Sequence, residues 1–168
     1  GLGRHNEIVI GQPTTAQWVA QKGLNGWLLD LFQFTFQSYW AQFGWMSIVI
    51  DRRFYLVFLA FTLISTILFF VWWAQRKNAV NTSRGLTLLA ALGAMTVLAF
   101  VWYNLQFVQF QGRYLYPALI PLAVAFALGW HQALRRFGAQ RWLWLALLLG
   151  FAVLDLYLLL RVILPGMK

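Results

Sequence analysis

The stretch from Gln111 to Leu119 holds the side chains of this sequence best suited to bind an anion. The guanidinium group of Arg113 can donate two parallel hydrogen bonds to a phosphate, and the hydroxyls of Tyr114 and Tyr116 lie close by in sequence. Gly112, just before the arginine, lets the main chain turn tightly. The pattern fits lipid-phosphate binding, and it also fits an ordinary arginine that anchors a helix at the membrane surface.

Asp155 is the second candidate, because it lies within an apolar run that begins at Trp142. The helical rise of 1.5 Å per residue places it roughly 20 Å along that run, where an acid is costly unless it is paired or protonated. Arg113 is a candidate partner, whereas Arg161 lies on another face of the helix and can reach the outer surface. Alternatively, a hydrogen-bonded or protonated Asp155 only orients helices.

His131 follows Trp130 near the end of an apolar run and could ligate a haem or chlorin axially, although a lone interfacial histidine is more often simply solvated. The sequence shows no metal-binding cluster, phosphate loop, nucleophile triad or close pair of acids. It has no cysteine, which excludes disulfides and thiolate catalysis. We therefore expect no metal, while a pigment or haem contact stays open.

Long apolar runs must position these residues. They are Phe54–Ala74, Gly85–Tyr103, Tyr114–Leu134 and Trp142–Leu160. Each approaches the roughly 20 residues that a helix needs to cross a bilayer. Charged residues make up only 10% of the chain, against about 25% in soluble domains. We predict four transmembrane helices within residues 54–164. The net charge of +9 comes from residues in the short loops between these runs, so it does not indicate a nucleic-acid surface.

The N-terminal residues divide into two parts. Residues 1–23 are polar and glycine-rich, which predicts an extended arm. Residues 24–43 carry a narrow polar stripe on an otherwise apolar and aromatic cylinder: Gly26, Asp30, Gln33 and Gln37. This is typical of an amphipathic helix lying on the membrane, or of a helix packed on partner subunits. The predicted fold is all-α, with four transmembrane helices and an N-terminal interfacial helix.

The basic residues predict an orientation in the membrane. Loops 75–84 and 135–141 lie on the same side and hold six Arg or Lys residues, whereas loop 105–113 holds only Arg113. The positive-inside rule makes the first two loops cytoplasmic and places both termini outside, although Arg52 and Arg53 argue the other way. The predicted location is a membrane, with a bacterial cytoplasmic membrane the expected one.

Two segments carry a family resemblance. Ser38-Tyr39-Trp40-Ala41-Gln42-Phe43-Gly44-Trp45-Met46 resembles an SFWGxFGWM stretch, and Gln111-Gly112-Arg113-Tyr114-Leu115-Tyr116-Pro117-Ala118-Leu119 resembles a QGRYLxPAL stretch. Both stretches are typical of an uncharacterised branch of the C-type glycosyltransferase superfamily, whose members use polyprenyl-phosphate-linked sugars at the outer membrane face. The ending Leu156–Pro165 is also similar, and the resemblance covers about residues 30–165.

The resemblance implies that Arg113 contacts the phosphate of a polyprenyl-phosphate lipid. Nothing here matches the catalytic acid of the superfamily, which lies in the first outer loop of a longer chain. The chain begins at Gly1 and shows no signal peptide, so we expect a processed chain or a piece of a longer protein. It would not catalyse glycosyl transfer alone.

Two functions remain open at this point. The chain is the C-terminal portion or split partner of a membrane glycosyltransferase-like protein, or it is a non-catalytic accessory subunit of a respiratory or photosynthetic complex. Expected partners are membrane lipids and other transmembrane subunits or the missing N-terminal part of a longer chain, and no nucleic acid. The donor sugar and acceptor are not readable from the residues.

Overall fold

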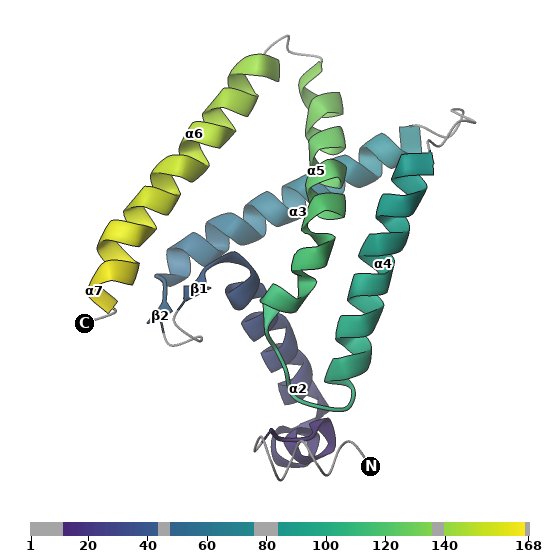
Figure 1. Cartoon of the computed structure of the whole chain (residues 1–168), viewed down its shortest axis with the longest axis vertical. Coiled ribbons are helices and arrows are strands. Elements are labelled where there is room, and N and C mark those ends of the chain that lie inside the picture. The colour runs from purple at the N-terminus through teal and green to yellow at the C-terminus, as the bar shows by residue number, and fades with distance from the viewer. Residues whose placement is uncertain (1–11, 44–47, 76–83, 136–139, 167–168) are drawn as a thin grey trace. The chain divides into compact units, whose positions relative to one another are not determined.

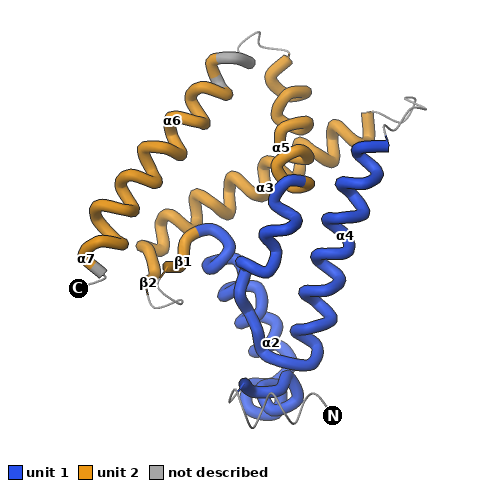
Figure 2. Tube along the Cα trace, viewed as in Figure 1, with its two compact units in different colours: residues 1–40, 84–120 blue, residues 41–83, 121–168 orange. Residues whose placement is uncertain are grey.

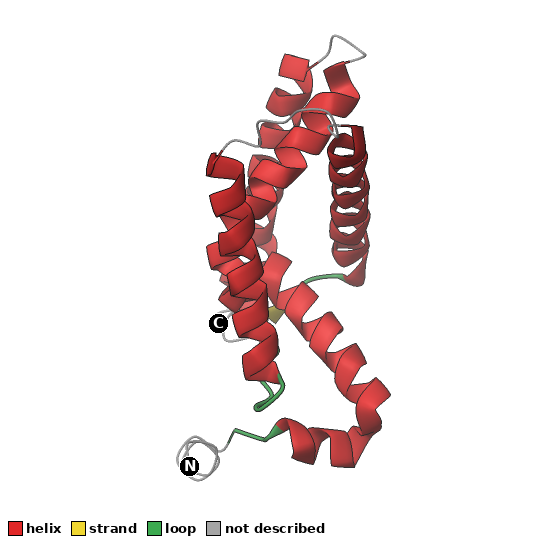
Figure 3. Cartoon of the chain, turned by 90° about the vertical axis from the view of Figure 1, so that its right-hand side faces the viewer, coloured by secondary structure: helices red, strands yellow, loops and turns green. Residues whose placement is uncertain are grey.

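The computed structural model describes residues 12–43, 48–75, 84–135 and 140–166. These residues form helices almost throughout (Figure 3). Four of the helical segments are long and apolar enough to cross a membrane: Arg52–Gln75, Arg84–Asn104, Gly112–Leu134 and Trp144–Ile163. The predicted all-α membrane fold with four spans is therefore confirmed at the level of helix length and composition.

The helix α2 (Thr15–Trp40) begins with a capping box. The Gln17 main-chain N–H donates to Thr14 Oγ1 at 3.3 Å, and the Thr14 N–H donates to Gln17 Oε1 at 2.9 Å. These reciprocal bonds satisfy main-chain donors that a helix start would otherwise leave unpaired. They also explain why the helix begins well before the predicted start at Leu24.

Gly23 divides α2 into two arms. Its φ of 74° and ψ of 169° lie in a region that is essentially restricted to glycine, so the chain bends there without strain. The second half of the predicted polar arm is consequently helical, and the helix ends at Trp40 rather than at residue 43. Residues 1–11 of the arm lie outside the described residues.

Two short strands, β1 (Gln42–Phe43) and β2 (Ile48–Val49), follow α2 and pair antiparallel. Residues 44–47 between them, which include the end of the first resemblance segment, lie outside the described residues. Asp51 then caps α3 (Arg52–Gln75), because its Oδ1 accepts a hydrogen bond from the Arg53 N–H at 2.8 Å.

The remaining spans are labelled in Figure 1. After α4 (Arg84–Asn104), residues 105–111 lead into a 3-10 helix, η1 (Gly112–Ala118), which continues as α5 (Leu119–Leu134). Pro117 accounts for the change of helix type, since it lacks an N–H and disfavours α geometry in the residue before it.

The last span is not α-helical throughout. It consists of α6 (Gln140–Leu158), a π-helical turn, η3 (Leu159–Ile163), and the short α7 (Leu164–Gly166). A π turn inside an α-helix is rare and frequently occurs at a functional site.

The chain divides into two compact units, coloured separately in Figure 2. Unit 1 holds residues 1–40 and 84–120, and its aromatic centre is the buried Phe110. The Phe110 ring stacks on Phe34 at 6.5 Å between centroids and meets the edges of Trp18 and Trp27 at 6.0 and 6.5 Å. The loop before η1 is thereby fixed against both arms of α2.

Unit 2 holds residues 41–83 and 121–168. Within it, α5 crosses α3 at Gly129, where a Cβ would lie only 2.6 Å from the main-chain nitrogen of Phe69. Beside the crossing, Trp130 Nε1 donates to the hydroxyl of the fully buried Ser65 at 2.9 Å. A small residue that brings two main chains together is a common device for packing helices in lipid.

Candidate functional site

The 3-10 helix η1 has one buried side and one exposed side. A 3-10 helix repeats every three residues. The buried or half-buried positions follow that repeat: Gly112, Leu115 and Ala118. The exposed positions include all the predicted phosphate ligands: Arg113, Tyr114 and Tyr116. The helix type therefore places these three side chains outside the packed interior of unit 1.

Gly112 fixes η1 against α2. Its N–H donates to the hydroxyl of the buried Ser38 at 2.7 Å, and that hydroxyl in turn donates to the Phe34 carbonyl at 2.6 Å. A Cβ at position 112 would collide with main-chain atoms of Thr35 and Tyr39. Only glycine permits this approach, which holds the main chain before Arg113 in place.

Tyr39 and Tyr116 form the second contact between α2 and η1. Their rings meet edge to face at 5.8 Å between centroids. Burial raises the pKa of the Tyr39 phenol above its ordinary value, and the nearby Tyr116 phenol raises it further. Tyr39 therefore stays neutral at physiological pH and adds no negative charge beside Tyr116.

The Tyr114 hydroxyl belongs to a polar chain of side chains. Gln109 Nε2 donates to it at 2.9 Å, Gln12 Nε2 donates to Gln109 Oε1, and the Tyr103 hydroxyl donates to Gln12 Oε1 at 3.3 Å. Because Tyr114 accepts a bond from Gln109, its own O–H remains available as a donor. The Arg113 guanidinium carbon lies 5.5 Å from the centre of the Tyr114 ring. A charged hydrogen-bond donor, the guanidinium, and a neutral one, the Tyr114 hydroxyl, therefore belong to neighbouring side chains.

The lengths of η1 and α5 place Arg113 near a membrane surface. The 16 residues of α5 span about 24 Å at the α-helical rise, and the seven residues of η1 about 14 Å at the 3-10 rise. Their sum, about 38 Å, exceeds the roughly 30 Å of a hydrocarbon core. We therefore expect a residue one position from the end of this span to lie at headgroup depth, where lipid phosphates are found.

Both ends of α2 contact the same end of the spans. Thr15 Oγ1 donates to the Asn104 carbonyl, at the end of α4, with a distance of 2.7 Å, and Ser38 accepts from Gly112, at the start of the next span. These span ends are joined by residues 105–111 and face the same side of a membrane. A helix that crossed the bilayer would have its ends on opposite sides, so these contacts favour the prediction that α2 stays on one side of the membrane.

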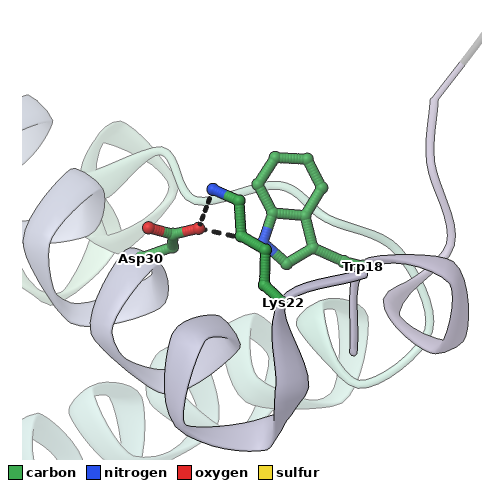
Figure 4. Close-up of polar contacts among 3 residues, drawn as sticks. All are labelled: Trp18, Lys22 and Asp30. Carbon is green, nitrogen blue, oxygen red and sulfur yellow. Dashed lines mark hydrogen bonds and ion pairs between the residues drawn. The ribbon is translucent and has the colours of Figure 1, made fainter. Parts of the chain in front are cut away.

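The polar stripe predicted on α2 includes one residue that holds its two arms together. Asp30 Oδ2, on the second arm, accepts hydrogen bonds from Lys22 Nζ at 2.7 Å and from Trp18 Nε1 at 3.0 Å, both on the first arm (Figure 4). The Lys22 ammonium also lies 4.5 Å from the centre of the Trp18 ring. The bend at Gly23 is therefore closed by an ion pair, a hydrogen bond and a cation–π contact.

The outward surface of the second arm is apolar. Its most exposed large side chains are Leu24, Leu28, Leu29 and Phe32. The stripe residues Gly26, Asp30 and Gln37 are half-buried beside it, and Gln33 is exposed. An exposed apolar surface next to a polar stripe suits the boundary between headgroups and acyl chains.

Asp155 lies on an exposed side of α6, in unit 2. Among the residues that the structure describes, no hydrogen bond or ion pair to its carboxylate is found. An acid near the centre of a bilayer costs about 2.5–3.5 kcal/mol on insertion scales. Arg113 belongs to unit 1, so the expected pairing of Arg113 with Asp155 stays a prediction. Arg161 is exposed within the π turn η3.

His131 lies exposed in the last turn of α5, as the sequence placed it. The described ranges contain no group of three or more histidine, cysteine or acidic residues arranged to hold a metal ion. A haem or pigment contact through His131 is not tested by this geometry.

Sequence reasoning named the exposed side chains but missed the residues that hold them. The sequence did not single out Ser38 or Gln109, because their roles depend on their partners. Ser38 bonds Gly112, which is 74 residues away, and Gln109 bonds Tyr114, which is five residues away. The start of α2 carried a readable signal, because Thr14 and Gln17 have the spacing of a capping box. We overlooked it because Pro13 and Gly23 suggested a loop.

Comparison with protein-family models found no match for this chain. Comparisons with curated proteins and with solved structures also found no match. The resemblance described above therefore rests on sequence segments alone and stays a prediction.

Proposed function

We propose that this chain is the membrane-embedded C-terminal portion, or a split partner, of a lipid-linked-sugar glycosyltransferase-like protein. In this proposal unit 1 binds the phosphate of a polyprenyl-phosphate lipid at the membrane surface through Arg113, Tyr114 and Tyr116. The chain does not catalyse glycosyl transfer by itself, because no residue matches the expected catalytic acid.

One observation carries the proposal: the start of the first segment that resembles the family lies against the second segment. Ser38 and Tyr39 of the first segment contact Gly112 and Tyr116 of the second, although more than 70 residues separate them in the sequence. Independent segments need not meet in space. Their contact builds a rigid base from which Arg113 extends outward.

The chemistry of the exposed side supports a phosphate ligand. Arg113 offers a planar fork that matches two phosphate oxygens, and Tyr114 keeps an O–H to donate to a third. The Tyr39 phenol, which contacts Tyr116, stays neutral, so it does not repel an anion. The length of the span supplies the depth at which a lipid phosphate is encountered.

The test is binding of a polyprenyl monophosphate to the full chain in lipid nanodiscs, measured by native mass spectrometry. Arg113→Gln should weaken binding roughly ten- to a hundredfold, because it removes a charge-assisted contact of about 1.5–3 kcal/mol. Arg113→Lys should bind the lipid with an affinity between those of wild type and Arg113→Gln, since lysine keeps the charge but lacks the planar fork of arginine.

Arg161→Gln is the matched control, because Arg161 is also an exposed arginine near the end of a span. It should leave binding unchanged, and the uncharged polyprenol should bind weakly to every variant. Equal binding of the phosphate by wild type and Arg113→Gln would mean that Arg113 only anchors the helix, and the proposal would be withdrawn.

A further inference from the structure

The last span has two different sides within unit 2. One side packs on α3: the Phe151 ring meets Phe61 at 5.7 Å between centroids, Tyr157 lies 5.8 Å from Phe54, and Leu158 is buried. These contacts fix the rotation of α6 about its own axis. They determine which residues of the span are turned away from α3.

Next to the α3-facing side runs an exposed row of residues with Asp155 at its centre. The row consists of Leu148, Ala152, Asp155 and Leu159, all of them exposed. Their spacings of four, three and four residues are those at which one helix packs along another. The small Ala152 next to the acid allows a second helix to approach closely. We refer to these four residues as the Asp155 row.

Asp155 lies well inside the last candidate span, about two helical turns before its end. Ile163, the last residue of the span, is eight residues further on, or about 12 Å at the helical rise. A hydrocarbon core of roughly 30 Å has its midplane at about 15 Å. A carboxylate at that depth is costly unless it is protonated or paired.

A third feature marks the same part of the helix. The π turn η3 begins at Leu159, the last residue of the row. Such turns insert an extra residue and occur frequently at functional sites. Of the three acids that the structure describes, Asp30, Asp51 and Asp155, Asp155 alone falls within a candidate span. A carboxylate, a row with helix-packing spacing and a π turn therefore occur in the same part of the last span.

We propose that the Asp155 row binds a transmembrane helix from outside this chain, and that this helix carries a lysine or arginine near its middle. The apolar members of the row supply the packing surface. The carboxylate supplies the complementary charge, and an ion pair with a cation at the same depth satisfies both groups. This proposal does not depend on phosphate binding by Arg113.

The probe is a synthetic transmembrane helix of about 20 leucine and alanine residues with one central lysine, and an otherwise identical helix without it. The full chain, which has no cysteine, is labelled at Leu164→Cys. Association in lipid vesicles is measured by energy transfer. Wild type should bind the lysine helix at least about tenfold more tightly than the control helix. Asp155→Leu should lose this preference, and Asp155→Asn should lose most of it.

A matched pair of variants tests the surface rather than the charge. Ala152→Phe should block association, because it places a bulky ring in the row. Ala146→Phe adds the same ring to another exposed side of α6 and should have no effect. Equal effects of the two variants would show that the row is not the binding surface.

Two further outcomes would overturn the proposal. Wild type could bind both helices equally, which would leave Asp155 as a protonated residue in lipid. Alternatively, the lysine helix could bind Arg113→Gln and not wild type, which would identify Arg113 as an internal partner that already occupies the carboxylate. Association of the lysine helix with wild type and Arg113→Gln alike supports an open site.

Discussion

The residue that most constrains the candidate phosphate site is Gly112, which has no side chain of its own. We predict that Gly112→Ala destabilises the chain by at least about 1–3 kcal/mol, because its Cβ would collide with main-chain atoms of α2 that cannot move independently. Gly150→Ala is the control, since a Cβ there has nothing within 4 Å. Thermal unfolding in detergent should separate the two variants, and similar melting temperatures would contradict the close approach.

Ser38 should be needed for stability although it is far from Arg113 in sequence. Ser38→Ala leaves the Gly112 N–H without its acceptor in a buried position, which costs about 1–3 kcal/mol. Thr96→Ala removes a hydroxyl that bonds only within its own helix, to the Leu92 carbonyl, and should change stability by much less. Chemical unfolding of both variants checks this, and a Ser38→Ala chain as stable as wild type would remove Ser38 from the base of the site.

At the scale of elements, the bend in α2 should depend on Asp30. Asp30→Ala removes the acceptor shared by Lys22 and Trp18, so the two arms should open. The ion pair is partly exposed and contributes no more than about 1 kcal/mol, which predicts a shift in population rather than unfolding.

Spin labels at Ala16→Cys and Leu29→Cys, one on each arm, would report the bend as a distance distribution. Asp30→Ala should broaden it toward longer distances. Gln33→Ala, which changes an exposed residue on the same arm, should leave it unchanged. An unaltered distribution in Asp30→Ala would mean that Gly23 and the aromatic contacts alone set the bend.

The elements differ in how well the sequence predicted them. The four spans were predicted within a few residues, because lipid demands long apolar helices and the charged loops mark their ends. The 3-10 start of the third span was not predicted, although Pro117 is compatible with it, and no sequence pattern predicted the π turn η3. Contacts such as Gly112 with Ser38 depend on the path of the whole chain, so local patterns do not contain them.

At the scale of the whole molecule, the orientation in the membrane remains a prediction from charge. Single cysteines at Ala79 and Ala139 should resist an impermeant thiol reagent in intact cells, because loops 75–84 and 135–141 are expected to be cytoplasmic. Leu105→Cys, at an exposed position of the opposite loop, should react. The chain has no cysteine of its own, so labelling is unambiguous. The reverse pattern would invert the topology and place Arg113 on the cytoplasmic side.

The 3-10 geometry of η1 also makes the span sensitive to the thickness of the surrounding lipid. Seven residues at the 3-10 rise are about 3.5 Å longer than the same residues in an α-helix. Such a difference is comparable to the difference in hydrocarbon thickness between natural membranes, and helices adjust to it by tilting or by distorting the bilayer. Lipids with longer acyl chains would draw Arg113 below the phosphates, and shorter ones would lift it into water. If Arg113 binds a headgroup phosphate as proposed, the acyl-chain length of the host membrane becomes a determinant of how well the two groups meet.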